Sequence, residues 1–584
     1  MCNENIKQLK INEIIIDKYI NSKNFDLTVY DVRNLIYYFF SYADVSIYVN
    51  AGKYEAPDAS IEVLTGIYSN CSKKMKKDIG QSINLNLTQI AYRNKIYKDI
   101  WVLGEYKALS NIMPVIHKNK INIYDVFLIK GGFHLDYKDD KYLNYECMDI
   151  LLTRINLICD FNFRLKSVSD LKKFSEKYYK SGSIRIDLNS LLFMYKKYFN
   201  KFYLHYKNYS YLLCDEFLKE FGNFDLEDFN RFLASIYCFN QIEKDVVKST
   251  ILKEGNIFLD KCNIDKNLTR FYTKNINYDI FKNNLCSFGG FSKDSFDEIM
   301  KYFMYDYDDD IDLSGDDYIV PFVRKNGVLY FNTIFNAKMV SPRNLIYAIN
   351  KLSNIINNDG KYNSVSKKLE LNFLNFMKGV FESYNLSFFE GKEWRANRNT
   401  KGEIDAVVVC DSSKTILIVQ TKTVIAASNY RTLTNLQANM YVAIDQIERF
   451  DGLDKKIKNQ ILSDVIGKDV STYEVVNCIN SDGGIGTALI WEKIYKLNIV
   501  PFNMAVIVKY FNNNSDLKKF KLNMYSIIED LVKLVDPQLR QCTIDFEKYC
   551  NAPKIYHDDI VANYDLLADD AKKYSGKISE LLSN

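Results

Sequence analysis

The spacing of apolar residues divides the chain into a helical part and a later part that contains strands. Through residues 1–300, apolar positions recur at intervals of three and four, as in DLNSLLFMYKKYFNKFYLHY, and this period predicts amphipathic helices. Later come two almost continuously apolar runs rich in β-branched residues, GEIDAVVVCD and KTILIVQTKT, which predict strands inside a sheet. The predicted fold class is therefore α+β and multidomain.

The length of 584 residues exceeds the size at which a single hydrophobic core stops growing, so several domains are expected. Local pattern and composition set their boundaries. We predict a mostly helical region without an assigned role at 1–300, an acidic linker at 301–318, a hairpin with a connecting helix at 319–360, an α/β domain with a mixed central sheet at 361–512, and helices at 513–584.

Two of these boundaries depend on charge and turn signals. The acidic run MYDYDDDIDLSGDD lacks the Gly and Glu that an EF-hand loop requires at its sixth and twelfth positions, so a solvated, self-repelling linker is predicted. After it, the hairpin signal Asn326-Gly327 separates two short predicted strands. A helix is predicted from Pro342 to Asn354.

Residues 160–210 hold 11 Lys or Arg against 4 Asp or Glu, interleaved with aromatic residues. This composition fits either a nucleic-acid-binding face or a solvated lysine face opposite an aromatic core stripe. Because the whole chain shares this composition, we favour the second interpretation and assign no residue to binding. The aromatic residues are Phe163, Tyr178, Tyr179, Tyr195 and Tyr203.

Three glycines, Gly483, Gly484 and Gly486, lie between two segments predicted to be extended, YEVVNCI and MAVIVKYF. They complete neither G-x-G-x-x-G nor G-x-x-x-x-G-K-[ST], the patterns of phosphate-binding loops. We therefore predict a turn at this position, followed by a helix from Ser515 to Val535.

One carboxylate interrupts the apolar stripe of a predicted helix, SVSKKLELNFLNFMKGVFESYN. Glu370 precedes Phe373, Met377 and Phe381 by three, seven and eleven residues, which places it on their face. A carboxylate that faces a core needs an ion pair, a hydrogen bond or a cation. For Glu370 alone, an exposed helix-end residue or a lysine partner is an equal alternative.

A tight turn at residues 411–414 would join the two apolar strands. If the ends of that turn pair, the numbers of all paired residues sum to 825, as 411 and 414 do. Asp405 then lies opposite Gln420, and Lys422 lies opposite Glu403. Side-chain alternation puts Gln420 and Lys422 on one face with Asp405 beside them. Polar groups thus gather at one end of two otherwise apolar strands.

These side chains suit a divalent cation. Mg²⁺ prefers oxygen ligands, which Glu370, Asp405 and the amide oxygen of Gln420 can supply. A metal ion held there would polarise a phosphodiester and lower the pKa of a bound water, while Lys422 would orient that water or stabilise the transition state. The four histidines are far apart in sequence, and nothing in the group suggests Ser, Cys or His nucleophilic catalysis.

The order of these residues resembles the PD-(D/E)XK nuclease superfamily: a helix Glu, the Asp of GEID and a strand that ends in QTK. The resemblance covers residues 361–450. It implies a restriction-endonuclease-like α/β domain in which Glu370, Asp405 and Gln420 bind Mg²⁺ or Mn²⁺ and Lys422 assists catalysis.

A second resemblance lies in the following helix, YRTLTNLQANMYVAIDQIERF. Gln437 and Tyr441 are four residues apart on one face of it. This pair resembles the Q-x-x-x-Y motif of RecB-like nucleases, which implies that both side chains shape the site and contact the substrate strand.

Gln420 departs from the acidic residue of the family. Its neutral amide removes one negative charge, so metal affinity should fall unless a second acid such as Glu403 compensates. We expect a nuclease acting on DNA, with RNA as the alternative, and the layout is similar to restriction or anti-phage defence proteins. The alternatives are a catalytically inactive nuclease fold that serves as a nucleic-acid-binding or assembly module, and a helical interaction protein with an incidental hairpin.

Composition bounds the partners and the compartment. The net charge of +4 is too balanced to indicate a polyanion partner, so any nucleic-acid surface must be local. Twelve cysteines without a Cys-x-x-Cys pair predict free thiols in a reducing cytoplasm. The N-terminus lacks a secretory signal pattern, and no apolar run reaches the roughly 18 residues of a membrane helix. A protein partner or oligomer is expected through the N-terminal helical region.

Overall fold

The structure is a computed structural model that describes most of the chain. The described residues are 2–25, 36, 39, 64–65, 67–68, 94–118, 123–160, 179–180, 183–184, 188–209, 213–254, 273–306, 311–315, 318–356, 361–397, 400–422, 430–481, 484–562, 566–567 and 570. They belong to two compact units, each built from segments that are distant in sequence. Unit 1 comprises Met1–Asn21, Ala108–Asn162 and Glu370–Asn584, and unit 2 comprises Ser22–Lys107 and Phe163–Leu369.

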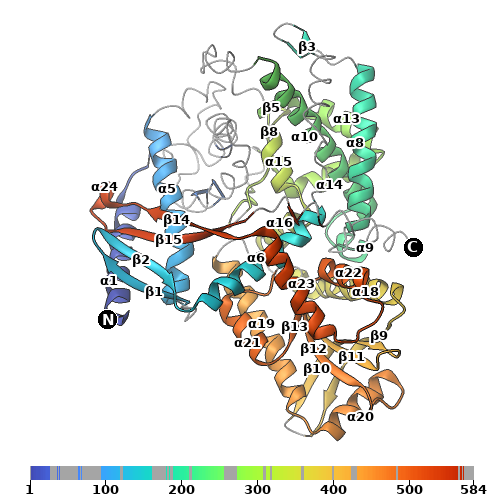
Figure 1. The fold of residues 1–584 in the computed structure, drawn as a ribbon. Helices are drawn as coiled ribbons and strands as arrows, with labels where there is room; N and C mark the ends of the chain where they lie inside the picture. Colours follow the sequence, from blue (N-terminus) through green and yellow to red (C-terminus); the bar gives the residue numbers. More distant parts are fainter. Residues whose placement is uncertain are drawn as a thin grey trace. The chain divides into compact units, whose positions relative to one another are not determined.

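The elements that lie mainly in unit 1 combine helices with two sheets (Figure 1). The helices are α1 (Cys2–Ser22), the π-helix η2 (Pro114–Lys118), α6 (Asp140–Asp160), α18 (Lys367–Ser383), α19 (Tyr430–Asp451), α20 (Lys455–Ile466), α21 (Ala488–Lys496), α22 (Met504–Asn513), α23 (Phe520–Val535) and α24 (Glu547–Cys550). The strands are β1 (Tyr124–Ile129), β2 (Gly132–Tyr137), β9 (Ser387–Arg395), β10 (Lys401–Cys410), β11 (Thr415–Lys422), β12 (Glu474–Ser481), β13 (Val500–Phe502), β14 (Gln538–Ile544) and β15 (Lys554–Val561).

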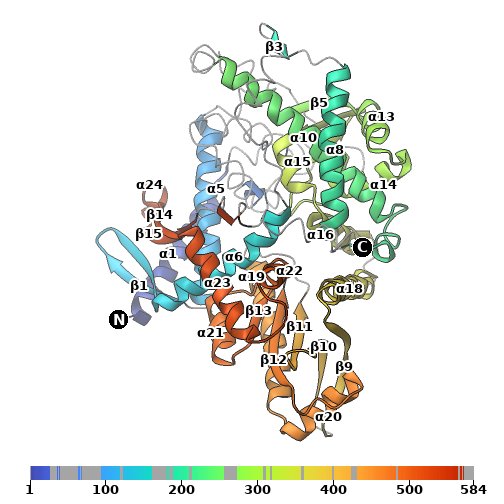
Figure 2. The same ribbon diagram turned by 45° about the vertical axis from the view of Figure 1, so that its right-hand side comes forward.

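The elements that lie mainly in unit 2 are mostly helical (Figure 2). The helices are α5 (Asn94–Met113), α8 (Leu188–Tyr209), α9 (Asp215–Leu218), α10 (Leu226–Glu254), α13 (Tyr278–Gly289), α14 (Lys293–Phe303), α15 (Thr333–Met339), α16 (Pro342–Ile356) and α17 (Lys361–Val365). The strands are β3 (Tyr179–Lys180), β4 (Ser183–Ile184), β5 (Thr273–Asn277), β6 (Met304–Asp306), β7 (Phe322–Lys325) and β8 (Val328–Asn332).

The five-stranded sheet of unit 1 is mixed and has the order β13-β12-β11-β10-β9. Strands β9, β10 and β11 form an antiparallel meander, whereas β12 runs parallel to β11 and β13 runs parallel to β12. Helices α19 and α20 occupy the long connection from β11 to β12, as a parallel crossover requires. The predicted mixed central sheet is therefore present within residues 361–512.

The predicted register of the β10–β11 hairpin is confirmed. Cys410 pairs with Thr415 across the turn, and the ladder continues to Ala406 and Val419, so every pair keeps the predicted sum of 825. The two faces divide as alternation requires. Helices cover both of them, which explains why these strands carry almost no polar residues.

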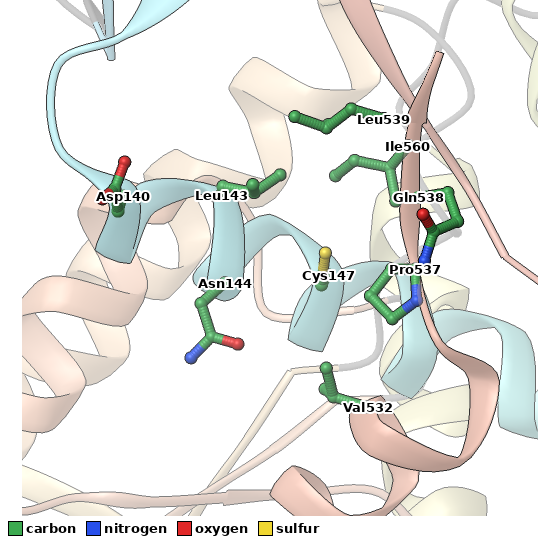
Figure 3. Close-up of a pocket in the computed structure, with 9 residues that line it drawn as sticks. All are labelled: Asp140, Leu143, Asn144, Cys147, Val532, Pro537, Gln538, Leu539 and Ile560. Carbon is green, nitrogen blue, oxygen red and sulfur yellow. The ribbon is translucent and has the colours of Figure 1, made fainter.

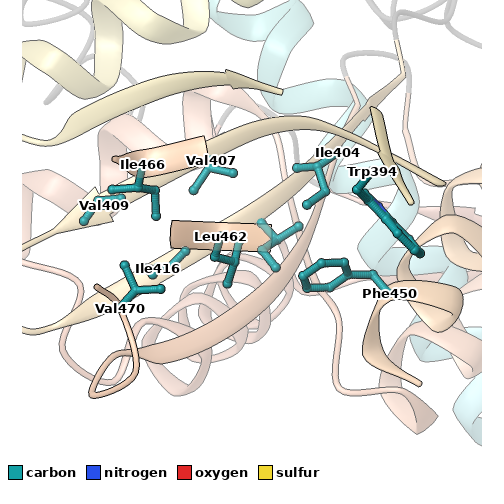
Figure 4. Packing of buried hydrophobic residues seen from close by; sticks show 10 residues of the cluster. Trp394, Ile404, Val407, Val409, Ile416, Phe450, Leu462, Ile466 and Val470 are labelled. Carbon is teal, nitrogen blue, oxygen red and sulfur yellow. The ribbon is translucent and has the colours of Figure 1, made fainter. Parts of the chain in front are cut away.

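One face of the meander packs on α20 and the end of α19 (Figure 4). Its buried cluster joins Val407, Val409, Ile416 and Ile418 of the strands to Leu462 of α20 and its neighbours. On the opposite face, the ring of Phe381 in α18 contacts Phe388 of β9, Phe502 of β13 and Phe511 of α22. The sheet is thus the middle layer of an α/β/α arrangement.

The second sheet of unit 1 joins residues from both ends of the sequence. Its order is β1-β2-β15-β14. The β1–β2 hairpin is antiparallel, and β2 pairs in parallel with β15, with Gly132 opposite Lys554. The prediction of helices throughout 513–584 is therefore wrong for β14 and β15, although α23 confirms the helix predicted at Ser515–Val535.

The four-stranded sheet of unit 2 has the order β5-β8-β7-β6 and packs on an aromatic core. The predicted Asn326-Gly327 hairpin joins β7 to β8, with both residues at positive φ, and the predicted helix at Pro342 is α16. Aromatic rings from helices α10, α13 and α14 meet over the sheet, including Phe232, Phe281 and Phe296.

The acidic run between α14 and β7 is not the solvated linker that its charge predicted. Asp306 is buried at the end of β6 and pairs with Arg324 of β7. Asp312 accepts a hydrogen bond from the Tyr68 hydroxyl. Basic and hydroxyl partners thus offset the repulsion expected of neighbouring carboxylates. Residues 307–310 and 316–317 lie outside the described part.

Two other predictions concern segments whose pattern was ambiguous. MAVIVKYF, predicted to be extended, lies in helix α22, because an apolar run of this length fits a buried helix as well as a strand. In 160–210, the Tyr195 and Phe199 rings stack inside unit 2, and the Tyr203 hydroxyl donates to Glu227. These contacts fit the core-stripe interpretation, whereas Phe163 and Tyr178 lie outside the described residues.

Thiols and helices also bear on the predicted compartment. Cysteines at eight positions have free thiols, which agrees with the sequence prediction there: 147, 214, 238, 286, 410, 478, 542 and 550. Within the described part of the chain, none of the helices combines the length and the apolarity needed to cross a bilayer.

Candidate metal-binding and catalytic site

The polar ends of β10 and β11 bring Asp405 and Lys422 together. The Lys422 Nζ atom lies 3.8 Å from Asp405 Oδ2, and both side chains are mostly buried. The same carboxylate oxygen accepts the backbone N–H of Thr421 at 2.7 Å. Burial raises the pKa of Asp405, while Lys422 and the Thr421 N–H oppose the rise. The Asp405 carboxylate is therefore held in place, but Lys422 and the Thr421 N–H only partly offset the cost of burying its charge.

Gln420 lies beside this pair and is 1% exposed. Its Nε2 atom donates to the main-chain oxygen of Glu403 at 2.7 Å, which fixes the orientation of the amide. Among the described residues, no group donates a hydrogen bond to its buried Oε1 atom. An unpaired buried carbonyl oxygen costs about 1–3 kcal/mol, so this atom is suited to a ligand that accepts its lone pair.

Strand pairing is interrupted at Asp405. The ladder with β9 runs to Ile404–Lys392 and resumes at Ala406–Glu390. Val407 and Ile404 both belong to the buried cluster on one face of the sheet, although they are three residues apart. The regular alternation of side chains between the two faces therefore changes between them. The pairs on both sides of this gap keep one register, so no residue is inserted there. The contact between Lys422 and Asp405 agrees with the predicted register, which placed Asp405 beside Lys422 on the same face.

Gly391 of β9 permits this geometry. A Cβ atom there would lie 1.5 Å from the main-chain oxygen of Ile404, so only glycine allows β9 to approach β10 beside Asp405.

Further carboxylates surround the pair. Glu403 pairs directly across from Glu393 of β9. Partial burial raises the pKa of Glu403, and the charges of Asp405, Glu393 and Glu370 raise it further, while Lys422 lowers it. The charges of three other carboxylates therefore reach Glu403, and this favours a cation in the region.

Glu370 lies in the first turn of α18, but the structure corrects its predicted orientation. Its side chain is exposed, whereas Phe373, Met377 and Phe381 of the same helix are buried. A helix start lets the carboxylate leave the apolar stripe, which was the alternative interpretation. Its charge still reaches Glu403, so Glu370 belongs to the acidic surroundings of the site.

Gln437 and Tyr441 both face helix α21. Gln437 is buried, and its Oε1 accepts the hydroxyl of Thr487 at 2.5 Å. The Tyr441 ring lies 4.8 Å from the Lys493 ammonium. These contacts hold α19 against α21, so Gln437 has a structural task that the motif did not indicate. Contact with a substrate strand stays a prediction for both residues.

The glycine-rich turn after β12 binds a carboxylate of the protein itself. Asp149 Oδ1 accepts the backbone N–H groups of Ile485 and Gly486 at 2.6 and 2.8 Å, and the Trp491 indole N–H at 3.2 Å. Gly484 and Gly486 have positive φ. The predicted turn is confirmed, and an aspartate from α6 fills the position that an anion would take. Sequence gave no signal for this contact, because the partners are hundreds of residues apart.

Asp149 should make stability depend on pH. Burial raises its pKa to about 6, above the unfolded value, so its contribution is present at low pH and is lost as pH rises through about 6. Asp149→Asn retains the accepting oxygen but cannot ionise. The change in the free energy of unfolding between pH 4 and 8 should therefore be about 1–3 kcal/mol smaller in this variant. The pH dependence that remains would come from Glu146, whose pKa burial raises to about 7. Asp149→Leu should lose about 2–4 kcal/mol at every pH. Urea unfolding measures both, and identical pH profiles for the unmodified protein and Asp149→Asn would contradict the assignment.

A small pocket lies elsewhere in unit 1 (Figure 3). It is lined mainly by apolar groups of α6, α23, β14 and β15, such as Leu143, Val532 and Ile560. None of the predicted site residues lines it, so the site at the β10–β11 ends does not depend on this pocket.

The donor set of the site fits a hard divalent cation. Carboxylate oxygens and a buried, oriented amide oxygen are ligands that Mg²⁺ and Mn²⁺ accept, and Gln420 Oε1 is available to one. No protein-family model, curated protein or solved structure matches the chain.

Proposed function

We propose that this chain is a Mg²⁺- or Mn²⁺-dependent nuclease that hydrolyses phosphodiester bonds, with DNA as the expected substrate and RNA as the alternative. The observation that carries the proposal is the buried Oε1 atom of Gln420, which has no donor among the described residues and lies beside the Asp405–Lys422 pair. Asp405, Gln420 and Glu370 would hold the ion, with Glu403 as the additional acid. When bound, the ion would supply a polarised phosphate and an activated water.

The chain's own residues would divide the remaining work. Asp405 is fixed by the Thr421 N–H, and Gln420 by the Glu403 carbonyl, so both oxygens are oriented before any ligand arrives. Lys422 can offer its ammonium to a scissile phosphate or to the attacking water. The mostly buried setting of Lys422 strengthens that electrostatic contribution relative to bulk water. The order helix α18, three antiparallel strands, helices α19 and α20, and a parallel strand supports the restriction-endonuclease-like domain that the resemblance implies.

The test is a cleavage assay with single- and double-stranded DNA and RNA in Mg²⁺ or Mn²⁺. Lys422→Met should reduce cleavage on the order of 100-fold while Mn²⁺ binding, measured by calorimetry, remains. Lys468→Met is the matched control, because this lysine pairs with Asp411 at the far turn of the same hairpin. Full cleavage by Lys422→Met would exclude the assigned role.

A second candidate function is a catalytically inactive nuclease fold that binds nucleic acid or assembles with partners. The neutral Gln420, in place of an acid, favours it. Binding to one of the four nucleic acids without cleavage in either metal would support this function and reject the first.

A further inference from the structure

Three metal-ligating side chains meet on the β14–β15 ribbon, in a part of unit 1 outside the five-stranded sheet. They are Cys542, His557 and Asp559, whose ligand atoms all lie within 4.8 Å of one another. Cys542 of β14 pairs directly with His557 of β15, and Asp559 follows His557 by two residues. Cross-strand pairing and alternation therefore put all three on one face of the ribbon.

We propose that these residues form a binding site for a transition metal ion of the zinc class. Cys542 Sγ lies 3.1 Å from Asp559 Oδ2, and His557 Nδ1 lies 3.4 Å from Asp559 Oδ1. Tetrahedral zinc with bonds of about 2.0–2.3 Å separates its ligand atoms by roughly 3.3–3.7 Å. Asp559 thus lies near this spacing from both other residues, and the three ligand atoms are all within 4.8 Å of one another.

The ligand types select the ion. Thiolate and imidazole favour zinc and similar metals over Mg²⁺, which prefers oxygen atoms alone. Cys542 and His557 are half-buried and Asp559 is half-exposed, so the fourth position faces solvent and suits a water. Arg540 also lies 4.0 Å from Asp559, but its side chain is 68% exposed and is free to turn outward when a cation binds.

The ion would fasten an edge strand. β14 is the outermost strand of its sheet, and its residues before Ile544 are mostly exposed, so little apolar burial holds it there. A metal ion bound by Cys542 and His557 would link β14 to β15. Solvent weakens such a link less than it weakens exposed hydrogen bonds.

The experiment is titration of the full-length protein, stripped of metal, with Co²⁺ and Zn²⁺. We expect one equivalent of Co²⁺ to give a thiolate-to-cobalt charge-transfer band that Zn²⁺ removes and Mg²⁺ does not. Cys542→Ser should abolish the band, and His557→Asn should weaken Zn²⁺ binding more than about tenfold. Cys550→Ser, which alters a half-buried free cysteine of neighbouring α24, should change neither.

Thermal unfolding supplies a readout that does not depend on cobalt. Zn²⁺ should raise the melting temperature of the unmodified protein, of Cys550→Ser and of Asp405→Asn, but not that of Cys542→Ser. Circular dichroism at low temperature shows whether each variant is folded. The proposal is overturned if the cobalt band persists in Cys542→Ser, or if Zn²⁺ stabilises folded Cys542→Ser as much as the unmodified protein.

Discussion

Asp405→Asn is expected to reduce metal-dependent cleavage of nucleic acid on the order of 1,000-fold. The substitution removes the charge that would hold the cation, but it keeps an oxygen that can accept the Thr421 N–H. Burial raises the pKa of Asp405, so a neutral side chain at this position avoids the cost of desolvating a charge. The free energy of unfolding of Asp405→Asn should therefore be at least as large as that of the unmodified protein. Loss of activity would therefore report on chemistry and not on unfolding.

The matched control is Asp411→Asn. Asp411 belongs to the turn of the same hairpin and pairs with Lys468 and the Tyr473 hydroxyl on the surface, where exposed pairs contribute little. Cleavage rates under single-turnover conditions and urea unfolding should be measured for both variants. Equal cleavage by Asp405→Asn and Asp411→Asn would remove Asp405 from the catalytic site.

Gln420→Glu is expected to destabilise the metal-free protein by about 3–5 kcal/mol, because it buries an unpaired charge. The new carboxylate would lose the bond from Nε2 to the Glu403 carbonyl and would lie near the acidic group of Asp405. Mn²⁺ should restore most of this loss, since a cation coordinated by the carboxylate neutralises it. Thermal unfolding with and without Mn²⁺ measures the recovery.

Gln446→Glu is the control for this recovery. Gln446 of α19 also has a buried Oε1 without a partner among the described residues, but it is not part of the candidate site. Its acidic variant should be destabilised without rescue by Mn²⁺. If Mn²⁺ stabilised Gln420→Glu no more than Gln446→Glu, Gln420 would not be a metal ligand, and the inactive fold would become the better description.

Local pattern was sufficient for the hairpin that carries the site. Two apolar runs joined by a short polar turn admit one register that keeps both faces apolar, and the structure has that register between Ala406 and Cys410. The same logic could not foresee the interruption at Asp405, because that depends on the close approach of β9 at Gly391. The contact of Lys422 with Asp405 agrees with the predicted register, which placed both side chains on one face.

Periodicity was less reliable where an element begins or where a residue has a distant partner. Glu370 lies on the apolar stripe by its number, yet it is in the first turn of α18, where a side chain can turn into solvent. Gln437 accepts a hydrogen bond from Thr487, and Asp149 accepts hydrogen bonds from the turn after β12. No local pattern encodes such pairings, because they form only when the helices pack.

The parallel pairing of β2 with β15 sets an order on how the protein can be made. Gly132 of β2 pairs with Lys554 of β15, which is synthesised much later. The β1–β2 hairpin and α6 therefore leave the ribosome long before the strand that completes their sheet. The larger segment of unit 2, Phe163–Leu369, is synthesised in between. Contacts of such long sequence separation form slowly, and the open edge of β2 is exposed to wrong partners meanwhile. A nascent chain of this protein should therefore depend on chaperones until residues 538–561 have emerged.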